Sequence, residues 1–318
     1  IASIVTLAYT WSGGILAVTL TDAVQYVIIV IGVTLCAYLA IDHLGGFDAM
    51  MSILYSNPRF ETNMKPLANW SLVQFLGLFF SFLLGEFCAP YYIQRYASTK
   101  SAKDSKNGLL IFGVHWIFFM ATTAAIGLAS MAIQPDVKPD LAFTNLIRDI
   151  LPPGITGLVF GALLAAVMST GAAMINTSAV IYTRDIYNKF INTAATQAQL
   201  LRQSRLSTLV VGGISIGVAI IFQDVFGLMI YMFKLWPSAI LPPLMCGLLW
   251  GKISPYAGAP AVIAGGLSFF LWSDKVLGEP FGIPANFIGI GMNCLVLFFV
   301  HQKMKGHKPE GPFLPDLN

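Results

Sequence analysis

Charged residues are scarce in this sequence. Asp, Glu, Lys and Arg make up 10% of its 318 residues, whereas they make up roughly a quarter of a soluble domain. So few charges cannot cover a water-exposed surface of that size. The low charge and the 23 Phe residues exclude a disordered chain. A net charge of +3 with scattered Lys and Arg argues against nucleic acid as a partner. The composition predicts a protein that crosses the lipid bilayer several times.

The sequence also lacks an initiating methionine and any recognisable cysteine motif. It begins with Ile1, and residues 1–11 are apolar but shorter than the roughly 20 residues that cross a bilayer. A signal peptide would have a basic start, which is missing. We therefore expect residues 1–11 to be the tail of a helix and the chain to be a fragment of a longer protein. The 4 cysteines show no disulfide or zinc spacing, so they are predicted to be small packing residues.

Long apolar runs with few charges predict eight membrane spans. Strands of a membrane barrel would instead alternate apolar and polar residues, and these runs do not. The predicted fold class is therefore an all-α polytopic membrane protein. The approximate ranges are 14–41, 67–93, 108–133, 154–182, 206–222, 225–250, 256–273 and 284–302.

The loops between the predicted spans alternate in their content of Lys and Arg. By the positive-inside rule, the cation-rich set is predicted to be cytoplasmic, and the set that collects Asp and Glu is predicted to face outward. The cytoplasmic set includes a predicted helix at 184–205 and a basic tail at 303–318, and the outer set includes a predicted short surface helix at 141–151. We predict one transmembrane domain over residues 1–318, located in the cell membrane.

One predicted span, 154–182, carries polar residues at helical spacing. Ala166, Ser169 and Thr170 stand at positions i, i+3 and i+4, so they share one face of a helix. One carbonyl oxygen and two hydroxyl oxygens could then converge on a hard cation such as sodium, because such cations prefer oxygen ligands. In the alternative, both hydroxyls donate hydrogen bonds back to the preceding turn, as Ser and Thr often do in membrane helices. The spacing alone leaves both interpretations open.

Three charged residues fall inside predicted spans: Asp22, Glu86 and Lys234. Charges within a membrane are costly and usually functional. Glu86 lies between Gly85 and Pro90, where the helix is expected to loosen, and Lys234 precedes a group of prolines. In one interpretation, Lys234 binds a solute carboxylate and Glu86 binds an amino group or a second ion. In the other, the two side chains neutralise each other.

Four stretches of the sequence occur in the order and spacing of one known family. They are GGILAVTLTDAVQ (13–25), IQRYASTKSAKDSKNG (93–108), ALLAAVMSTGAAMINTSAVIYTRDIY (162–187) and LPPLMCGLLWGKISPYAGA (241–259). Together they resemble the sodium:solute symporter family, which includes sodium–glucose, sodium–proline and sodium–pantothenate transporters. Each motif is weak by itself, but four in the right order are specific.

The resemblance implies the leucine-transporter-type fold, which is built from two inverted repeats of five helices. On that mapping the chain holds about eight transmembrane helices, namely core helices five to ten and two peripheral helices. The first four core helices would be missing, and residues 1–11 would be the tail of the fourth. Gly13 and Gly14 would then form a cytoplasmic turn.

The resemblance also implies roles for individual residues. Ala166, Ser169 and Thr170 match the family's sodium site, and Asp22 matches an acid that lines the sodium exit path. Substrate contacts are implied on the sixth and tenth core helices. The residues implied there are Gly85, Glu86 and Lys234.

The predicted function is sodium-coupled import of a small organic solute by alternating access. The charged residues favour a carboxylate-bearing solute, such as an organic acid or an amino acid. The predicted partners are the solute, the sodium ion and the lipid bilayer. Two alternatives stay open: a membrane sensor module of a signalling protein, and a proton-coupled permease of the same fold. An enzyme is not predicted, because Ser169 lacks the sequence context of an intramembrane serine protease.

Overall fold

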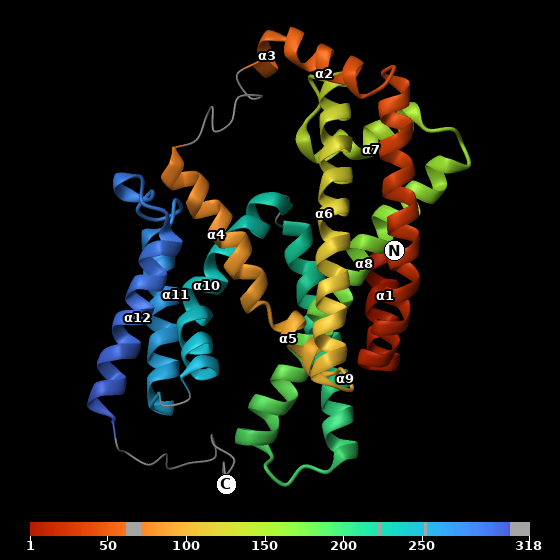
Figure 1. The fold of residues 1–318 in the computed structure, drawn as a ribbon. Helices are drawn as coiled ribbons and strands as arrows, with labels where there is room; N and C mark the ends of the chain where they lie inside the picture. The colour runs from red at the N-terminus through yellow and green to blue at the C-terminus, as the bar shows by residue number, and fades with distance from the viewer. Residues whose placement is uncertain (62–70, 222–223, 251–252, 306–318) are drawn as a thin grey trace. The chain divides into compact units, whose positions relative to one another are not determined.

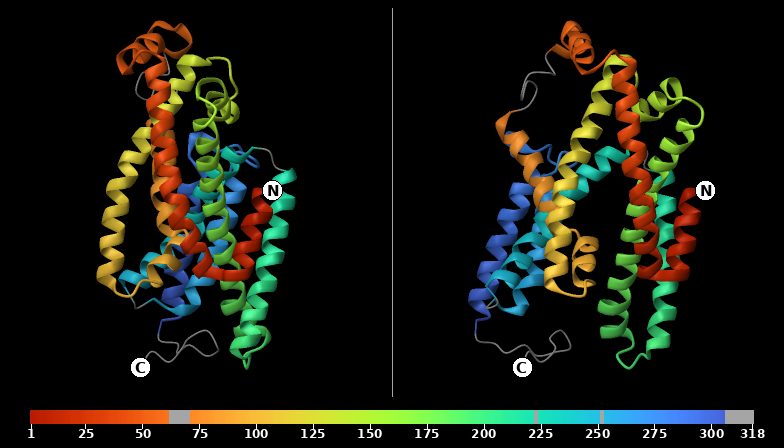
Figure 2. Two further views of the ribbon diagram at one scale, coloured as in Figure 1. Left: turned by 90° about the vertical axis from the view of Figure 1, so that its right-hand side faces the viewer. Right: turned by 45° about the vertical axis from the view of Figure 1, so that its right-hand side comes forward.

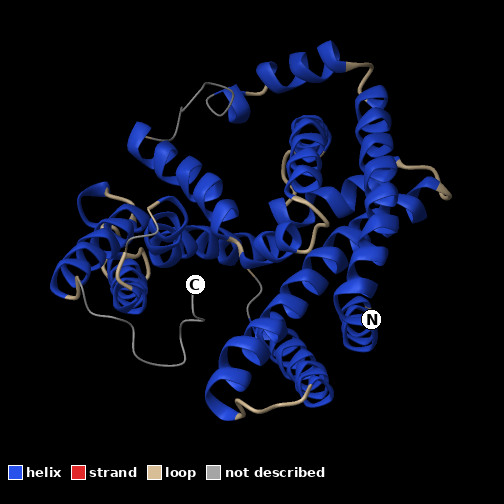
Figure 3. Ribbon diagram, turned by 60° about the horizontal axis from the view of Figure 1, so that its bottom comes forward, coloured by secondary structure: helices blue, strands red, loops and turns tan. Residues whose placement is uncertain are grey.

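The computed structural model of the chain describes residues 1–61, 71–221, 224–250 and 253–305. Within these ranges the chain forms helices and turns and no β-strand, so the predicted all-α class is confirmed (Figures 1 and 3). The helices are α1 (Ala2–His43), α2 (Phe47–Ser56), α3 (Pro58–Glu61), α4 (Leu72–Cys88), α5 (Pro90–Ala97), α6 (Ala102–Ile133), α7 (Pro139–Ile150), α8 (Ile155–Ile181), the π-helix η1 (Tyr182–Ile191), α9 (Gln197–Ile221), α10 (Val225–Leu249), the short η2 (Pro255–Ala257), α11 (Gly258–Trp272), the short η3 (Pro280–Gly282) and α12 (Ala285–Lys303).

In the described part of the chain, eight helical segments are long and apolar enough to cross a membrane, which is the predicted number. Each segment overlaps one predicted span. Residues 2–11, which were predicted to be the tail of a helix, are helical and fall within the first segment, Ala2–His43. The segments are Ala2–His43, Leu72–Ala97, Ala102–Ile133, Ile155–Ile191, Gln197–Ile221, Phe226–Leu249, Pro255–Trp272 and Ala285–Lys303. Most of the predicted tail at 303–318 lies outside the described residues.

Helix α1 consists of two helices joined at Gly14. The backbone there has φ 56° and ψ −145°, a conformation that glycine adopts readily and other residues rarely. The chain reverses its direction at this point (Figure 2). The predicted turn at Gly13 and Gly14 is thus present, and residues before it form a helix of their own.

The described helices group into two compact units, and each is described by itself. The first unit contains α1–α3, α6–α8, η1 and most of α9. The second contains α4, α5, the last residues of α9, and α10–α12. The prediction of one transporter domain over residues 1–318 stays a prediction.

In the first unit, the second half of α1 packs closely against α8. A Cβ atom at Gly32 would lie 2.5 Å from the Cβ of Ala162, so a larger residue would force the helices apart. The predicted surface helix is α7, and two of its side chains, Leu146 and Ile147, are fully buried. These residues join a core with α1, α6 and α8 that contains Val33, Cys36, Ala37, Ala40, Ile126, Ala129 and Val159.

The prediction of a single helix over 184–205 is wrong. Helix α8 continues as the π-helix η1 to Ile191, and α9 begins only at Gln197. A capping box explains the new start, because the Thr196 N–H donates to Gln199 Oε1 (2.8 Å) and the Gln199 N–H donates to Thr196 Oγ1 (3.4 Å). The T-x-x-Q spacing was the available sequence signal for this boundary.

In the second unit, α10 remains helical through Pro242 and Pro243. Proline has no N–H, so the carbonyls of Ser238 and Ala239, four residues earlier, lose their usual helical partners. The Asn293 side chain on α12 replaces both, because its Nδ2 donates to Ser238 O (3.0 Å) and to Ala239 O (2.7 Å). Helix α12 therefore stabilises the proline-rich part of α10.

Candidate functional site

The three oxygen atoms predicted for sodium lie together on α8. Ser169 Oγ donates to Ala166 O at 3.0 Å, and Thr170 Oγ1 donates to the same carbonyl oxygen at 3.2 Å. The oxygens converge as the spacing predicts, and the hydroxyl hydrogens make the hydrogen bonds of the alternative interpretation. A hydroxyl group can rotate its hydrogen away without moving its oxygen, so this arrangement is compatible with a cation that takes oxygen ligands.

Asp22 lies on the second half of α1, where Tyr9 of the first half comes near it. The Tyr9 hydroxyl donates to Met168 O (3.2 Å), next to Ser169 on α8. The Tyr9 hydroxyl also lies near the side chains of Asp22 and Gln25. Sequence reasoning did not select Tyr9 or Gln25. Gln25 belongs to the 13–25 motif, but only the fold shows that Tyr9 reaches both α8 and Asp22.

Gly85 and Glu86 lie near the end of α4. The helix ends at Cys88, Ala89 is extended (φ −65°, ψ 117°), and α5 begins at Pro90. The predicted loosening is therefore present, a few residues after Glu86. Gly85 is buried against α10, because a Cβ atom there would lie 2.7 Å from Phe233 Cδ1 and 2.9 Å from Phe233 O.

Glu86 and Lys234 do not pair with each other, and each lies next to a different residue. The Tyr92 hydroxyl on α5 lies near the Glu86 carboxylate, and the two side chains influence each other electrostatically. The Lys234 ammonium on α10 forms an ion pair with Glu279, with 3.1 Å between Nζ and Oε1. The structure therefore does not contain the Lys234–Glu86 neutralisation considered from the sequence.

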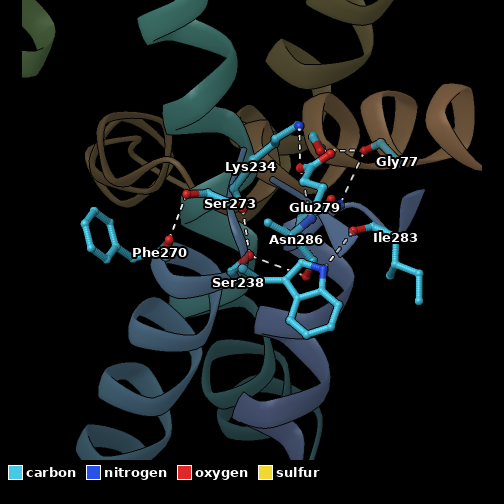
Figure 4. Close-up of polar contacts among 11 residues, drawn as sticks. Gly77, Lys234, Ser238, Phe270, Ser273, Glu279, Ile283 and Asn286 are labelled. Atoms are coloured by element: carbon cyan, nitrogen blue, oxygen red, sulfur yellow. Dashed lines mark hydrogen bonds and ion pairs between the residues drawn. The ribbon is translucent and has the colours of Figure 1, made fainter. Parts of the chain in front are cut away.

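Glu279 lies in the connection between α11 and α12, and its carboxylate faces the Lys234 ammonium group (Figure 4). Its Oε1 also accepts a hydrogen bond from the Ala285 N–H (3.1 Å), which is at the start of α12. The backbone of Glu279 has φ 50°, unusual for a residue with a side chain. Both side chains of the ion pair are mostly enclosed, with 21% of Lys234 and 23% of Glu279 exposed. Sequence reasoning missed Glu279, because it placed that residue in an outer loop.

Around this pair, α10 and α12 are joined by several hydrogen bonds (Figure 4). Ser238 Oγ donates to Lys234 O (2.8 Å) and to Asn286 O (3.4 Å). Asn286 Nδ2 in turn donates to Gly77 O on α4 (3.3 Å). Lys234 therefore projects from a rigid junction of three helices. Taken together, the described groups can bind ions and polar solutes, and they contain no cluster of His, Cys, Asp and Glu for a metal centre.

A sequence model of the sodium:solute symporter family matches residues 1–265. The chain belongs to the sodium:solute symporter family. Similar curated proteins include an osmoregulated proline transporter of Bacillus subtilis strain 168, 28% identical over 290 residues that cover 88% of this chain and 57% of the relative. A sodium/proline symporter of Escherichia coli K12 is 27% identical over 280 residues, 85% of this chain and 55% of the relative.

A solved structure of a Na⁺-coupled sialic acid symporter has a TM-score of 0.71 and 19% identity to the chain, covering 97% of this chain and 66% of the other. This likeness shows the leucine-transporter-type fold that the sequence resemblance implied. The chain spans little more than half the length of the curated relatives above. As a member of the sodium:solute symporter family, it is a multi-pass membrane protein related to transporters rather than to enzymes.

Proposed function

We propose that the protein imports a small organic solute together with sodium by alternating access. The observation that carries this proposal is the match of the sodium:solute symporter family to residues 1–265. In this account sodium is a transported ion rather than a resident cofactor. Binding of the ion and the solute in one state shifts the balance between the two orientations of the carrier.

The sodium ion is proposed to bind Ala166 O, Ser169 Oγ and Thr170 Oγ1. Support comes from their convergence, since both hydroxyl oxygens lie within 3.2 Å of the carbonyl oxygen. Three neutral oxygens are fewer than a hard cation prefers, so further ligands must complete the site. Asp22 is proposed to line the path by which the ion leaves, with Tyr9 between Asp22 and α8.

The solute is proposed to carry a carboxylate that Lys234 recognises, with Gly85 and Glu86 contributing from α4. Proline and sialic acid, which the relatives and the structural neighbour are named for, both carry a carboxylate at neutral pH. An ammonium group inside a membrane protein is a suitable ligand for such an anion. Gly85 contributes by letting the backbone of Phe233, next to Lys234, approach α4.

Uptake by cells that express the complete gene product tests this proposal. Radiolabelled L-proline and sialic acid are supplied with sodium chloride, and then with potassium chloride at the same ionic strength. We expect uptake of a carboxylate solute with sodium and at least about tenfold less with potassium. Uptake that ignores sodium and follows the proton gradient would support the proton-coupled permease instead, and no uptake under any condition would favour the sensor module.

A further inference from the structure

We propose that the Glu279 carboxylate pairs with Lys234 when the carrier is empty. When the solute binds, its own carboxylate displaces Glu279 from Lys234. This inference rests on the proposed function and assigns a specificity-determining role to a residue outside the predicted site. The solute class it implies is an organic anion with a single accessible carboxylate.

The geometry places Glu279 where such a carboxylate would bind. Its Oε1 is 3.1 Å from Lys234 Nζ, and it is the one acceptor of that ammonium group among the residues that the structure describes. An ammonium group has three N–H donors. A second carboxylate can therefore approach Lys234 before the bond to Glu279 is broken, which allows a stepwise exchange.

In alternating access the carrier changes its orientation once with the solute bound and once without it. Lys234 needs a partner of opposite charge in both of these states. An ammonium group without a partner is very unfavourable in a medium of low dielectric constant. When the solute is bound, its carboxylate pairs with Lys234. After the solute leaves, Glu279 can take its place, so the charge is neutralised in the loaded carrier and in the empty one.

Glu279 also has a partner that does not depend on Lys234. Its Oε1 accepts the Ala285 N–H at 3.1 Å, and the amino end of α12 carries a partial positive charge that favours an anion. Displacement by the solute therefore does not leave the Glu279 carboxylate without a hydrogen bond. Two residues of this connection, Glu279 (φ 50°) and Phe281 (φ 59°), hold left-handed backbone conformations that cost energy. From this connection the Glu279 carboxylate contacts both Lys234 and the Ala285 N–H.

A purely structural ion pair would behave differently from an internal competitor. Loss of a structural pair weakens folding and every transport parameter together. Loss of a competitor strengthens the binding of an anionic solute and leaves a neutral analogue unaffected. The variant Glu279→Gln separates the two, because the amide oxygen can still accept the Ala285 N–H while the negative charge is removed.

The test measures sodium-dependent uptake of L-proline, or of sialic acid if proline is not imported, by the complete gene product. We expect Glu279→Gln to lower the KM by about threefold to fivefold, the effect of removing one partly exposed ion pair. Inhibition by the corresponding carboxamide, such as prolinamide, should not change. Lys234→Met should raise the KM, and adding Glu279→Gln to Lys234→Met should have no further effect on it.

Asp274→Asn is the matched control. Asp274 is an exposed acid in the same connection, so its loss removes an equal charge without touching Lys234, and the KM should stay unchanged. If the KM of Glu279→Gln rises or stays constant, the inference is overturned while the proposed function stands. The same holds if Glu279→Gln lowers the KM equally when Lys234 is already replaced by Met. Absence of sodium-dependent uptake by the wild-type protein overturns the proposed function and this inference with it.

Discussion

The hydroxyl groups of Ser169 and Thr170 are the most informative polar groups that spacing alone could select. Their oxygens lie where the i, i+3, i+4 pattern places them, one turn from Ala166 O. Helical geometry is regular, so this part of the candidate site follows from the sequence. Whether the oxygens bind an ion depends on ligands beyond these three, and the spacing does not contain that information.

Replacement of Thr170 by Val tests its proposed contact with sodium. The variant keeps the shape of the side chain and removes the oxygen. We expect the sodium concentration for half-maximal uptake to rise about tenfold, which corresponds to the loss of a charge–dipole interaction of roughly 1.5 kcal/mol. The measurement is initial uptake as a function of sodium concentration.

Thr183→Val provides the comparison for this experiment. Thr183 Oγ1 donates to Ala179 O at 2.7 Å, the same type of bond to a preceding turn, at a place with no predicted ion. Its sodium dependence should match that of the wild-type protein. If the two valine variants shifted equally, the oxygen of Thr170 would have only a structural role.

Lys234 illustrates what the sequence could not provide. The residue itself stands out as a charge inside a predicted span, but its partner Glu279 is 45 residues away. Glu279 has a left-handed backbone and precedes α12, which packs against α10, the helix that carries Lys234. Sequence patterns locate costly charges, whereas their pairing is decided by tertiary packing.

Helices were predicted well where a single physical property determines them. Each span is an apolar run long enough for a bilayer, so the number of spans and most of their positions follow from hydropathy. Boundaries set by one or two hydrogen bonds were harder to predict. The capping box of Thr196 and Gln199 divides 184–205 into two elements. The prolines of α10 are tolerated because Asn293, on α12, donates hydrogen bonds to two α10 carbonyl groups.

The turn inside α1 provides a test of one of these elements. Gly14 has φ 56°, and a side chain is strained in that conformation whatever the free space around it. We expect Gly14→Ala to lower the free energy of unfolding by about 1–3 kcal/mol. Thermal unfolding of the purified protein in detergent measures the change.

Gly113→Ala is the appropriate control for that measurement. Gly113 lies inside α6 with an ordinary helical φ and with open space where a Cβ atom would be added. Alanine favours a helix more than glycine does, so this variant should be as stable as the wild-type protein or slightly more stable. A Gly14→Ala variant with the same stability as the wild type would contradict the assigned turn.

At the level of the whole molecule, composition and the order of four motifs were enough to identify a multi-pass membrane protein of the sodium:solute symporter family. The low charge predicts the bilayer, and the motifs predict the family and its fold. The candidate sodium oxygens with Asp22 belong to the first compact unit, and Gly85, Glu86 and Lys234 belong to the second. In an alternating-access transporter, coupling requires both sites to bias one conformational equilibrium.

Solute accumulation by the purified complete gene product in sealed lipid vesicles tests sodium-coupled import without interference from other transporters. An inward sodium gradient is imposed without a proton gradient, and internal radiolabelled L-proline or sialic acid is measured over time. We predict transient accumulation of the solute above its external concentration, abolished when sodium is equal on both sides. Accumulation that needs a proton gradient and ignores sodium, or no accumulation under either gradient, would contradict sodium-coupled import.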